Sequence, residues 1–168
     1  MLKEVERNLL KVIIDTNIFI DALSDDMDSS YILYREYMGE FQLYCSNAMT
    51  EELLHVYKHE TFPNRKYQKG YVLEIMYRWI RTFRRSMPVN TTKRLNIIKA
   101  DPSDNMFLEC ASESEAEIIV TSDAHFNIAK GKIFNINNKA VEIYSKSEFL
   151  ELLDKVKRDK NNQVAIGE

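Results

Sequence analysis

The 168-residue sequence predicts an α/β fold, a three-layer α/β/α sandwich around a central, mostly parallel sheet. Short apolar runs typical of buried strands alternate along the chain with segments whose apolar residues recur at helical spacing. Strands separated by helices form right-handed crossovers, and such crossovers produce a parallel sheet covered by helices on both faces. The length suits one domain with its own core.

Four short apolar runs are expected to form the strands. They are residues 11–15 (KVIID), 41–45 (FQLYC), 117–121 (EIIVT) and 141–144 (VEIY). The first and third runs consist largely of Ile and Val, whose branched side chains pack well on a sheet that is covered on both faces. We therefore expect these two runs to be buried strands.

The segments after the first two strands have the spacing of helices. NIFIDAL and SSYILYREYMGEF follow the first strand, and Gly39 is expected to end the second of these helices. The residues expected to share much of one face of that helix are Ile32, Tyr34, Tyr37 and Met38. After the second strand, Ser46 or Asn47 can cap a helix that runs to about His59.

Three later segments are also expected to be helical. Residues 66–86 carry apolar side chains at three- and four-residue steps, namely Val72, Ile75, Met76, Trp79 and Phe83. Ser103 can cap a helix from Asp104 to about Ser114, and SKSEFLELLDKV predicts a terminal helix. The expected organisation is a lead at residues 1–10, a domain at residues 11–157 and a polar tail at residues 158–168.

Composition and charge exclude several classes of protein. With 45% hydrophobic and 29% charged residues, the chain differs from a disordered one, and no apolar run reaches the length of a membrane span. The charged start lacks the apolar stretch of a signal peptide. Cys45 and Cys110 form no CxxC pair and are interpreted as buried thiols of a reducing compartment.

The charge is distributed unevenly along the sequence. Residues 58–99 contain eleven Lys or Arg and two acids, which gives this segment a charge of +9 and the rest of the chain −12. Such asymmetry predicts one surface for a polyanion and another for cations. Within the basic segment, the residues expected to contact a nucleic-acid backbone are Arg78, Arg81, Arg85, Lys93 and Arg94.

Four carboxylates are expected to share one pocket. Asp15 and Asp123 each follow a predicted strand, and ligand sites of parallel sheets lie beyond the carboxyl ends of the strands. Asp104 opens the helix that leads into the Asp123 strand, where it can also act as a cap, as can Asp101 just before it. Helical phase places Glu52 at the edge of a buried face and Glu51 away from it.

Four clustered carboxylates repel one another unless they hold hard divalent cations, which prefer oxygen ligands. Mg²⁺ or Mn²⁺ bound there would engage a phosphodiester and activate water. His125, directly after Asp123, is interpreted as a helix-start residue rather than a general base.

The stretches VIIDTNIFIDAL, LYCSNAMTEELLHVY, DPSDNMFLECA and AEIIVTSDAHF resemble the PIN-domain family, in particular its toxin-like bacterial and archaeal ribonucleases. With the tail VEIYSKSEFLELL, the resemblance covers residues 12–153. The family pattern is an Asp in a D-T-N turn, a helical Glu, an Asp opening a late helix, and a T-x-D strand end. These positions correspond here to Asp15, Glu52, Asp104 and Asp123.

The resemblance implies endonucleolytic cleavage of RNA by water, leaving a 5′-phosphate, with Mg²⁺ or Mn²⁺ as cofactor. It also implies a cytoplasmic location, frequent homodimers, and often an antitoxin protein as the partner of a toxin–antitoxin pair. Thr16, Asn17 and Ser122 fall on positions that support the site.

Four other interpretations rank lower. A haloacid-dehalogenase-type phosphatase needs Asp-x-Asp after the first strand, and Asn17 replaces the second Asp. A receiver domain needs a phosphoacceptor Asp that FQLYCSN lacks. A zinc site at His55 and His59 is disfavoured because no HExxH motif accompanies the pair. The remaining alternative is a catalytically inactive PIN-fold module that binds RNA or protein.

Overall fold

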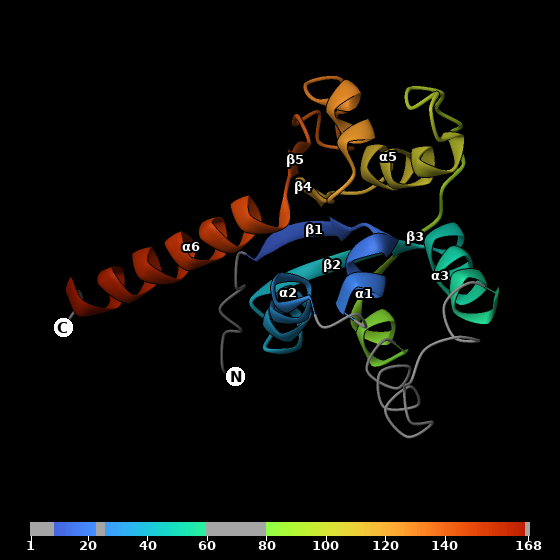
Figure 1. The fold of residues 1–168 in the computed structure, drawn as a ribbon. Coiled ribbons are helices and arrows are strands. Elements are labelled where there is room, and N and C mark those ends of the chain that lie inside the picture. The colour runs from blue at the N-terminus through green and yellow to red at the C-terminus, as the bar shows by residue number, and fades with distance from the viewer. Residues whose placement is uncertain (1–8, 23–25, 60–79, 167–168) are drawn as a thin grey trace, which may run out of the picture.

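The computed structural model describes residues 9–22, 26–59 and 80–166, and shows an α/β sandwich around a five-stranded parallel sheet (Figure 1). The strands are β1 (Leu10–Ile14), β2 (Phe41–Ser46), β3 (Met87–Val89), β4 (Ile118–Val120) and β5 (Glu142–Tyr144). Their order in the sheet is β3-β2-β1-β4-β5, and every neighbouring pair is parallel. The predicted fold class is therefore confirmed.

The order of the strands reverses at β1. The chain moves outward from β1 to β2 and β3, and then returns to the other side of β1 to add β4 and β5. Val12 pairs with Ile118 and Ile14 with Val120, so β1 and β4 end at the same edge of the sheet. In open parallel sheets, the crevice beside such a reversal is where ligands bind.

β3 is the strand that the sequence did not predict. It has only three residues and includes Pro88, which cannot donate a hydrogen bond to a neighbouring strand. Proline is tolerated because β3 pairs on one side alone, with β2. Three residues are also too few to show an alternating pattern.

The helices cover both faces of the sheet. They are α1 (Thr16–Ala22), α2 (Met27–Tyr37), α3 (Asn47–His59), α5 (Asn105–Ser112) and α6 (Lys146–Ile166), with two 3-10 helices, η1 (Pro102–Asp104) and η2 (Ala124–Ala129). One core cluster joins Ile13 to α5 and η2, while the other joins Val12 and Ile14 to α1, α2 and α6. Figure 1 shows α5 on one side of the sheet and α1 and α2 on the other.

The four residues expected to share a face of α2 differ in burial. Ile32 is buried, but Tyr34, Tyr37 and Met38 are exposed. Arg35 is buried instead, and its guanidinium group donates to Glu40 and, at 2.6 Å, to Asp154 on α6. The side of α2 that carries Arg35 therefore packs against α6, and the tyrosines remain exposed.

The ends of three helices can be compared with the predictions. Gly39 lies just beyond α2 with a φ of +71°, a conformation that favours glycine, as expected for a helix stop. The prediction that Ser103 caps the helix after it is wrong, because Asp101 accepts the Ser103 N–H and η1 precedes α5. α6 continues to Ile166, beyond the expected end of the domain at residue 157.

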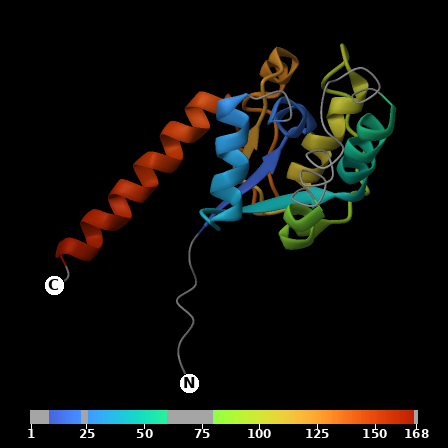
Figure 2. The ribbon, with the colours of Figure 1, turned by 60° about the horizontal axis from the view of Figure 1, so that its bottom comes forward.

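α6 extends well away from the sheet (Figure 2). Phe149 and Leu153 anchor its first half in the core, and residues 157–162 are exposed. Of the predicted helix at residues 66–86, the part before residue 80 lies outside the described residues, and residues 80–85 are helical. No helix within the described part of the chain is long and apolar enough to cross a membrane.

Candidate functional site

Asp15 lies at the edge of the sheet where β1 ends, directly beside the end of β4. Its backbone N–H donates to the Val120 carbonyl oxygen at 3.0 Å, and the residue is only 2% exposed. The carboxylate accepts the Thr121 hydroxyl at 2.6 Å and the Asn17 N–H at 3.2 Å. Burial raises the pKa of Asp15, although the Thr121 and Asn17 hydrogen bonds favour its charged form.

Asp123 is fixed at the same edge by a turn. Its backbone N–H donates to the Thr121 hydroxyl oxygen at 2.9 Å, so Thr121 contacts both aspartates that follow the paired strands β1 and β4. The Asp123 carboxylate accepts the His125 N–H at 2.7 Å and thereby caps η2. The two aspartates are close enough for the charge of Asp123 to raise the pKa of Asp15 further.

Glu52 approaches from α3, on the helix face that the sequence predicted. Its carboxylate accepts the Thr16 hydroxyl at 2.7 Å, which connects the start of α1 to α3. Glu52 is half-buried whereas Glu51 is exposed. Burial raises the pKa of Glu52, and the negative charges of Asp15 and Asp101 add to this increase.

Asp104 is the acid of the group whose pKa departs most from its ordinary value. It is 7% exposed, and its Oδ2 atom is buried without a hydrogen-bond partner among the described residues. It precedes α5 but makes no side-chain capping bond, so its burial does not stabilise the helix end in the usual way. Burial and the charges of four neighbouring acids raise its pKa to about 7; these acids are Asp101, Asp15, Asp123 and Glu52.

The structure thus brings the carboxylates of Asp15, Glu52, Asp104 and Asp123 close enough to interact electrostatically. A buried carboxylate oxygen without a donor is costly unless a cation compensates it. The set consists of oxygen donors, which Mg²⁺ and Mn²⁺ prefer. The residues therefore fit a hard divalent cation.

The supporting residues play different parts. Thr16 binds Glu52, and Asn17 donates from its backbone and, at 3.5 Å, from its side chain to Asp15. Ser122 is exposed, while the neighbouring Thr121 is buried and makes the contacts. Sequence reasoning did not select Thr121, although it is the first letter of the T-x-D strand end that marks Asp123.

Two of the basic candidates, Arg81 and Arg85, lie apart from the carboxylates. Arg78 lies outside the described residues. Arg81 and Arg85 stack over the Tyr37 ring, 4.9 and 5.9 Å from its centroid, and Arg85 donates to the Tyr37 carbonyl oxygen at 3.0 Å. Tyr37 precedes the first residue of β2, so both arginines lie at the edge of the sheet opposite the acids.

Lys93 and Arg94 lie along α5 instead. Lys93 Nζ donates to the Ser112 carbonyl oxygen, and the guanidinium group of Arg94 pairs with Glu109 at 3.3 Å while its side chain is 75% exposed. Leu95 N–H also binds Glu109, and Ile97 N–H binds Asn105, the first residue of α5. The chain therefore follows α5 from Lys93 back to its N-terminus, where Asp104 lies.

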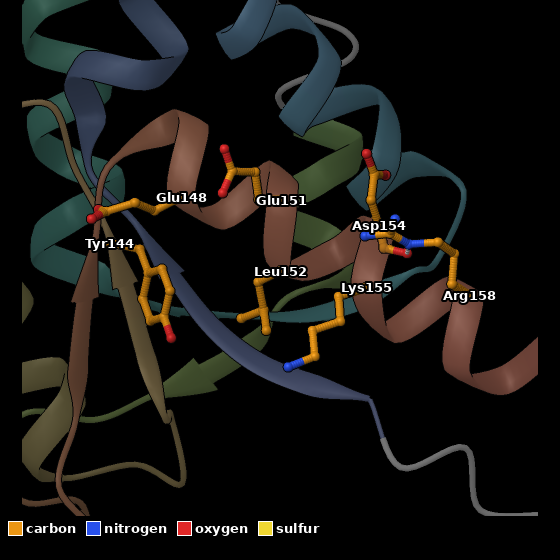
Figure 3. A pocket seen from close by; sticks show the side chains of 7 residues that line it. All are labelled: Tyr144, Glu148, Glu151, Leu152, Asp154, Lys155 and Arg158. Carbon is orange, nitrogen blue, oxygen red and sulfur yellow. Dashed lines mark hydrogen bonds between the residues drawn. The ribbon is translucent and has the colours of Figure 1, made fainter.

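A groove between β5 and α6 is a separate surface feature (Figure 3). Its lining is mostly charged, and it consists of Tyr144, Glu148, Glu151, Leu152, Asp154, Lys155 and Arg158. None of the four clustered carboxylates is among these residues, so the groove is not part of the candidate site.

Two comparisons relate the chain to known proteins. Residues 11–125 match the family model described as PIN domain, a span that contains all four acids. The chain is also 28% identical over 159 residues to the uncharacterized protein MJ1680 of Methanocaldococcus jannaschii, an alignment that covers 92% of this chain and 98% of that protein.

Proposed function

Since the chain belongs to the PIN-domain family, whose members are generally nucleases, we propose that it is a metal-dependent endoribonuclease that hydrolyses RNA phosphodiester bonds. One observation carries the proposal: the buried Oδ2 of Asp104, which has no hydrogen-bond partner within residues 9–22, 26–59 and 80–166, lies near the charges of Asp15, Glu52 and Asp123. A structural role alone does not account for this arrangement, because Asp104 makes no capping bond.

We assign Asp15, Glu52, Asp104 and Asp123 as the catalytic, metal-binding residues. A bound Mg²⁺ or Mn²⁺ would polarise the phosphodiester and lower the pKa of a water molecule. The protein's part is to hold the carboxylates in place: Thr121 fixes Asp15, and Thr16 fixes Glu52. The His125 N–H fixes Asp123 in the same manner. Such hydrogen bonds to ligating carboxylates orient them toward the ion.

RNA is the proposed substrate, and its backbone would be held by the basic segment. Lys93 and Arg94 are the foremost contacts in this proposal because their chain leads along α5 to Asp104. Arg81 and Arg85 would contact only RNA that reaches the opposite edge of the sheet, next to Tyr37.

A finer proposal places the protein in the cytoplasm as the toxin of a toxin–antitoxin pair, inhibited by an antitoxin protein and acting as a homodimer. The resemblance of its motifs to toxin-like ribonucleases supports this role. Co-purification of the chain with the product of a neighbouring small gene, and loss of cleavage in that complex, would be the expected result. If expression of the active chain alone does not slow growth, the toxin role is contradicted, whereas the proposed nuclease activity is not.

The nuclease activity itself is tested by cleavage of a mixed single-stranded RNA. We expect 5′-phosphate products with Mg²⁺ or Mn²⁺ and none with EDTA. Asp123→Asn should lose most of the activity, because each metal contact contributes several kcal/mol in the transition state. Equal cleavage by wild type and Asp123→Asn would mean that the activity comes from a contaminant or another site.

A further inference from the structure

His125 lies beside the candidate metal site in a position that the four carboxylates leave unexplained. It is the second residue of η2, and its backbone N–H donates to Asp123 at 2.7 Å. The imidazole Nδ1 lies 3.3 Å from Asp123 Oδ1, and half of the side chain is exposed. The turn needs only the backbone N–H of this residue, so the ring is free to have another role.

The ring faces the same space as Asp104. One ligand atom each from Asp104, Asp123 and His125 lies within 4.8 Å of the others. An octahedral Mg²⁺ ion binds oxygen at about 2.1 Å. Adjacent ligand atoms are then roughly 3 Å apart, and opposite ligand atoms roughly 4.2 Å apart. The limit of 4.8 Å lies slightly above the separation of opposite ligands, so small rotations of the three side chains would bring them onto one ion.

A second and independent feature points to a cation at this place. Asp104 is more than nine-tenths buried, and its Oδ2 has no hydrogen-bond donor among the described residues. An ionised carboxylate in this state is stabilised by a cation, and the His125 ring and the Asp123 carboxylate each place a possible ligand atom beside Asp104.

We propose that His125 is a nitrogen ligand of the metal ion held by Asp104 and Asp123, so that the site has a mixed nitrogen and oxygen donor set. This inference rests on the metal site of the proposed function. Imidazole suits transition-metal ions, whereas Mg²⁺ favours oxygen donors alone. The site should accordingly prefer Mn²⁺ to Mg²⁺.

The direct test is electron spin-echo envelope modulation of Mn²⁺ added to the whole protein, because this signal reports nitrogen bonded to the ion. We expect modulation from nitrogen-14 in the wild type and in the control variant His55→Gln, on α3. The modulation should disappear in His125→Gln. Bound Mn²⁺ without nitrogen modulation, or modulation that persists in His125→Gln, would overturn the proposal and leave the carboxylate site intact. Absence of Mn²⁺ binding would overturn both.

Affinity provides a second measurement. Calorimetric titration should show that His125→Gln binds Mn²⁺ at least about tenfold more weakly, while its Mg²⁺ affinity falls less. His125→Asp, which replaces nitrogen by oxygen, should narrow the preference for Mn²⁺. The melting temperature of metal-free His125→Gln should equal that of the wild type, because residue 125 keeps the backbone N–H that donates to the capping Asp123 carboxylate. If His125→Gln loses Mn²⁺ affinity and Mg²⁺ affinity by the same factor, the proposal of a nitrogen ligand is contradicted.

Discussion

The Thr121 hydroxyl donates to Asp15 Oδ2 at 2.6 Å across the boundary between β4 and β1. The same oxygen accepts the Asp123 N–H at 2.9 Å. One buried side chain therefore sets the distance between the two aspartates that end these strands. Thr121 directly follows β4, and its hydroxyl links the two aspartates.

Thr121→Val tests this link, because valine keeps the shape of threonine and removes the hydroxyl. We expect RNA cleavage to fall about 10- to 100-fold, as is typical when a metal ligand is no longer oriented by its hydrogen-bond partner. Thr121→Ser retains the hydroxyl and should keep most of the activity. If valine and serine variants cleave RNA equally well, the hydroxyl does not position Asp15.

The two adjacent glutamates of α3 make a matched pair of variants. Glu52→Gln should abolish most cleavage, since Glu52 is half-buried, accepts from Thr16 and interacts with Asp15. Glu51→Gln should cleave RNA as the wild type does, because Glu51 is exposed. A dead Glu51→Gln beside an active Glu52→Gln would reverse the assignment of the catalytic glutamate.

Asp104 should destabilise the metal-free protein near neutral pH. Its folded-state pKa is about 7, above the ordinary value of 3.8, because burial and neighbouring acids disfavour its charge. A raised folded-state pKa costs stability once the pH exceeds the unfolded-state value, and the cost stops growing above about pH 7. Asp104→Asn in EDTA should therefore melt above the wild type, by a margin that widens from pH 5 to about pH 7 and then stays constant.

Metal should reverse that advantage. Mg²⁺ at one hundred times its dissociation constant stabilises the wild type by about 2.7 kcal/mol, and the variant should gain less. The measurement is a set of melting curves for both proteins with EDTA and with Mg²⁺. A lower melting temperature for Asp104→Asn in EDTA would show that Asp104 chiefly stabilises the start of α5.

The path of the RNA is tested by two double variants. Lys93→Ala with Arg94→Ala should weaken binding and lower the slope of log affinity against log salt by about 0.7 for each phosphate that the variant no longer neutralises. Arg81→Ala with Arg85→Ala should change the slope less, since both side chains stack on Tyr37 at the far edge of the sheet. Binding measured across a series of salt concentrations gives both slopes. If the Arg81/Arg85 double variant changes the salt slope more than the Lys93/Arg94 double variant does, the RNA crosses the edge of the sheet next to Tyr37.

The fold class and the local elements were accessible from sequence. Apolar runs placed β1, β2, β4 and β5 within a residue or two of their bounds, because strands in the sheet carry short apolar runs. β3 carried no such signal, since it has three residues and a proline. The residues expected to share one face of α2 differ in burial, because periodicity identifies a face and does not say what will cover it.

Of the candidate site, the sequence by itself determined the kind of residues and their local positions: Asp15 and Asp123 after their strands, and Glu52 rather than Glu51 on the inner side of its helix. Tertiary structure alone decided that β1 and β4 are neighbours, that Thr121 joins their aspartates, and that Asp104 is buried among them. The reason is physical. Phase along a strand or helix depends on residues a few positions apart, whereas strand order and burial depend on contacts such as Asp15 with Thr121, 106 residues apart.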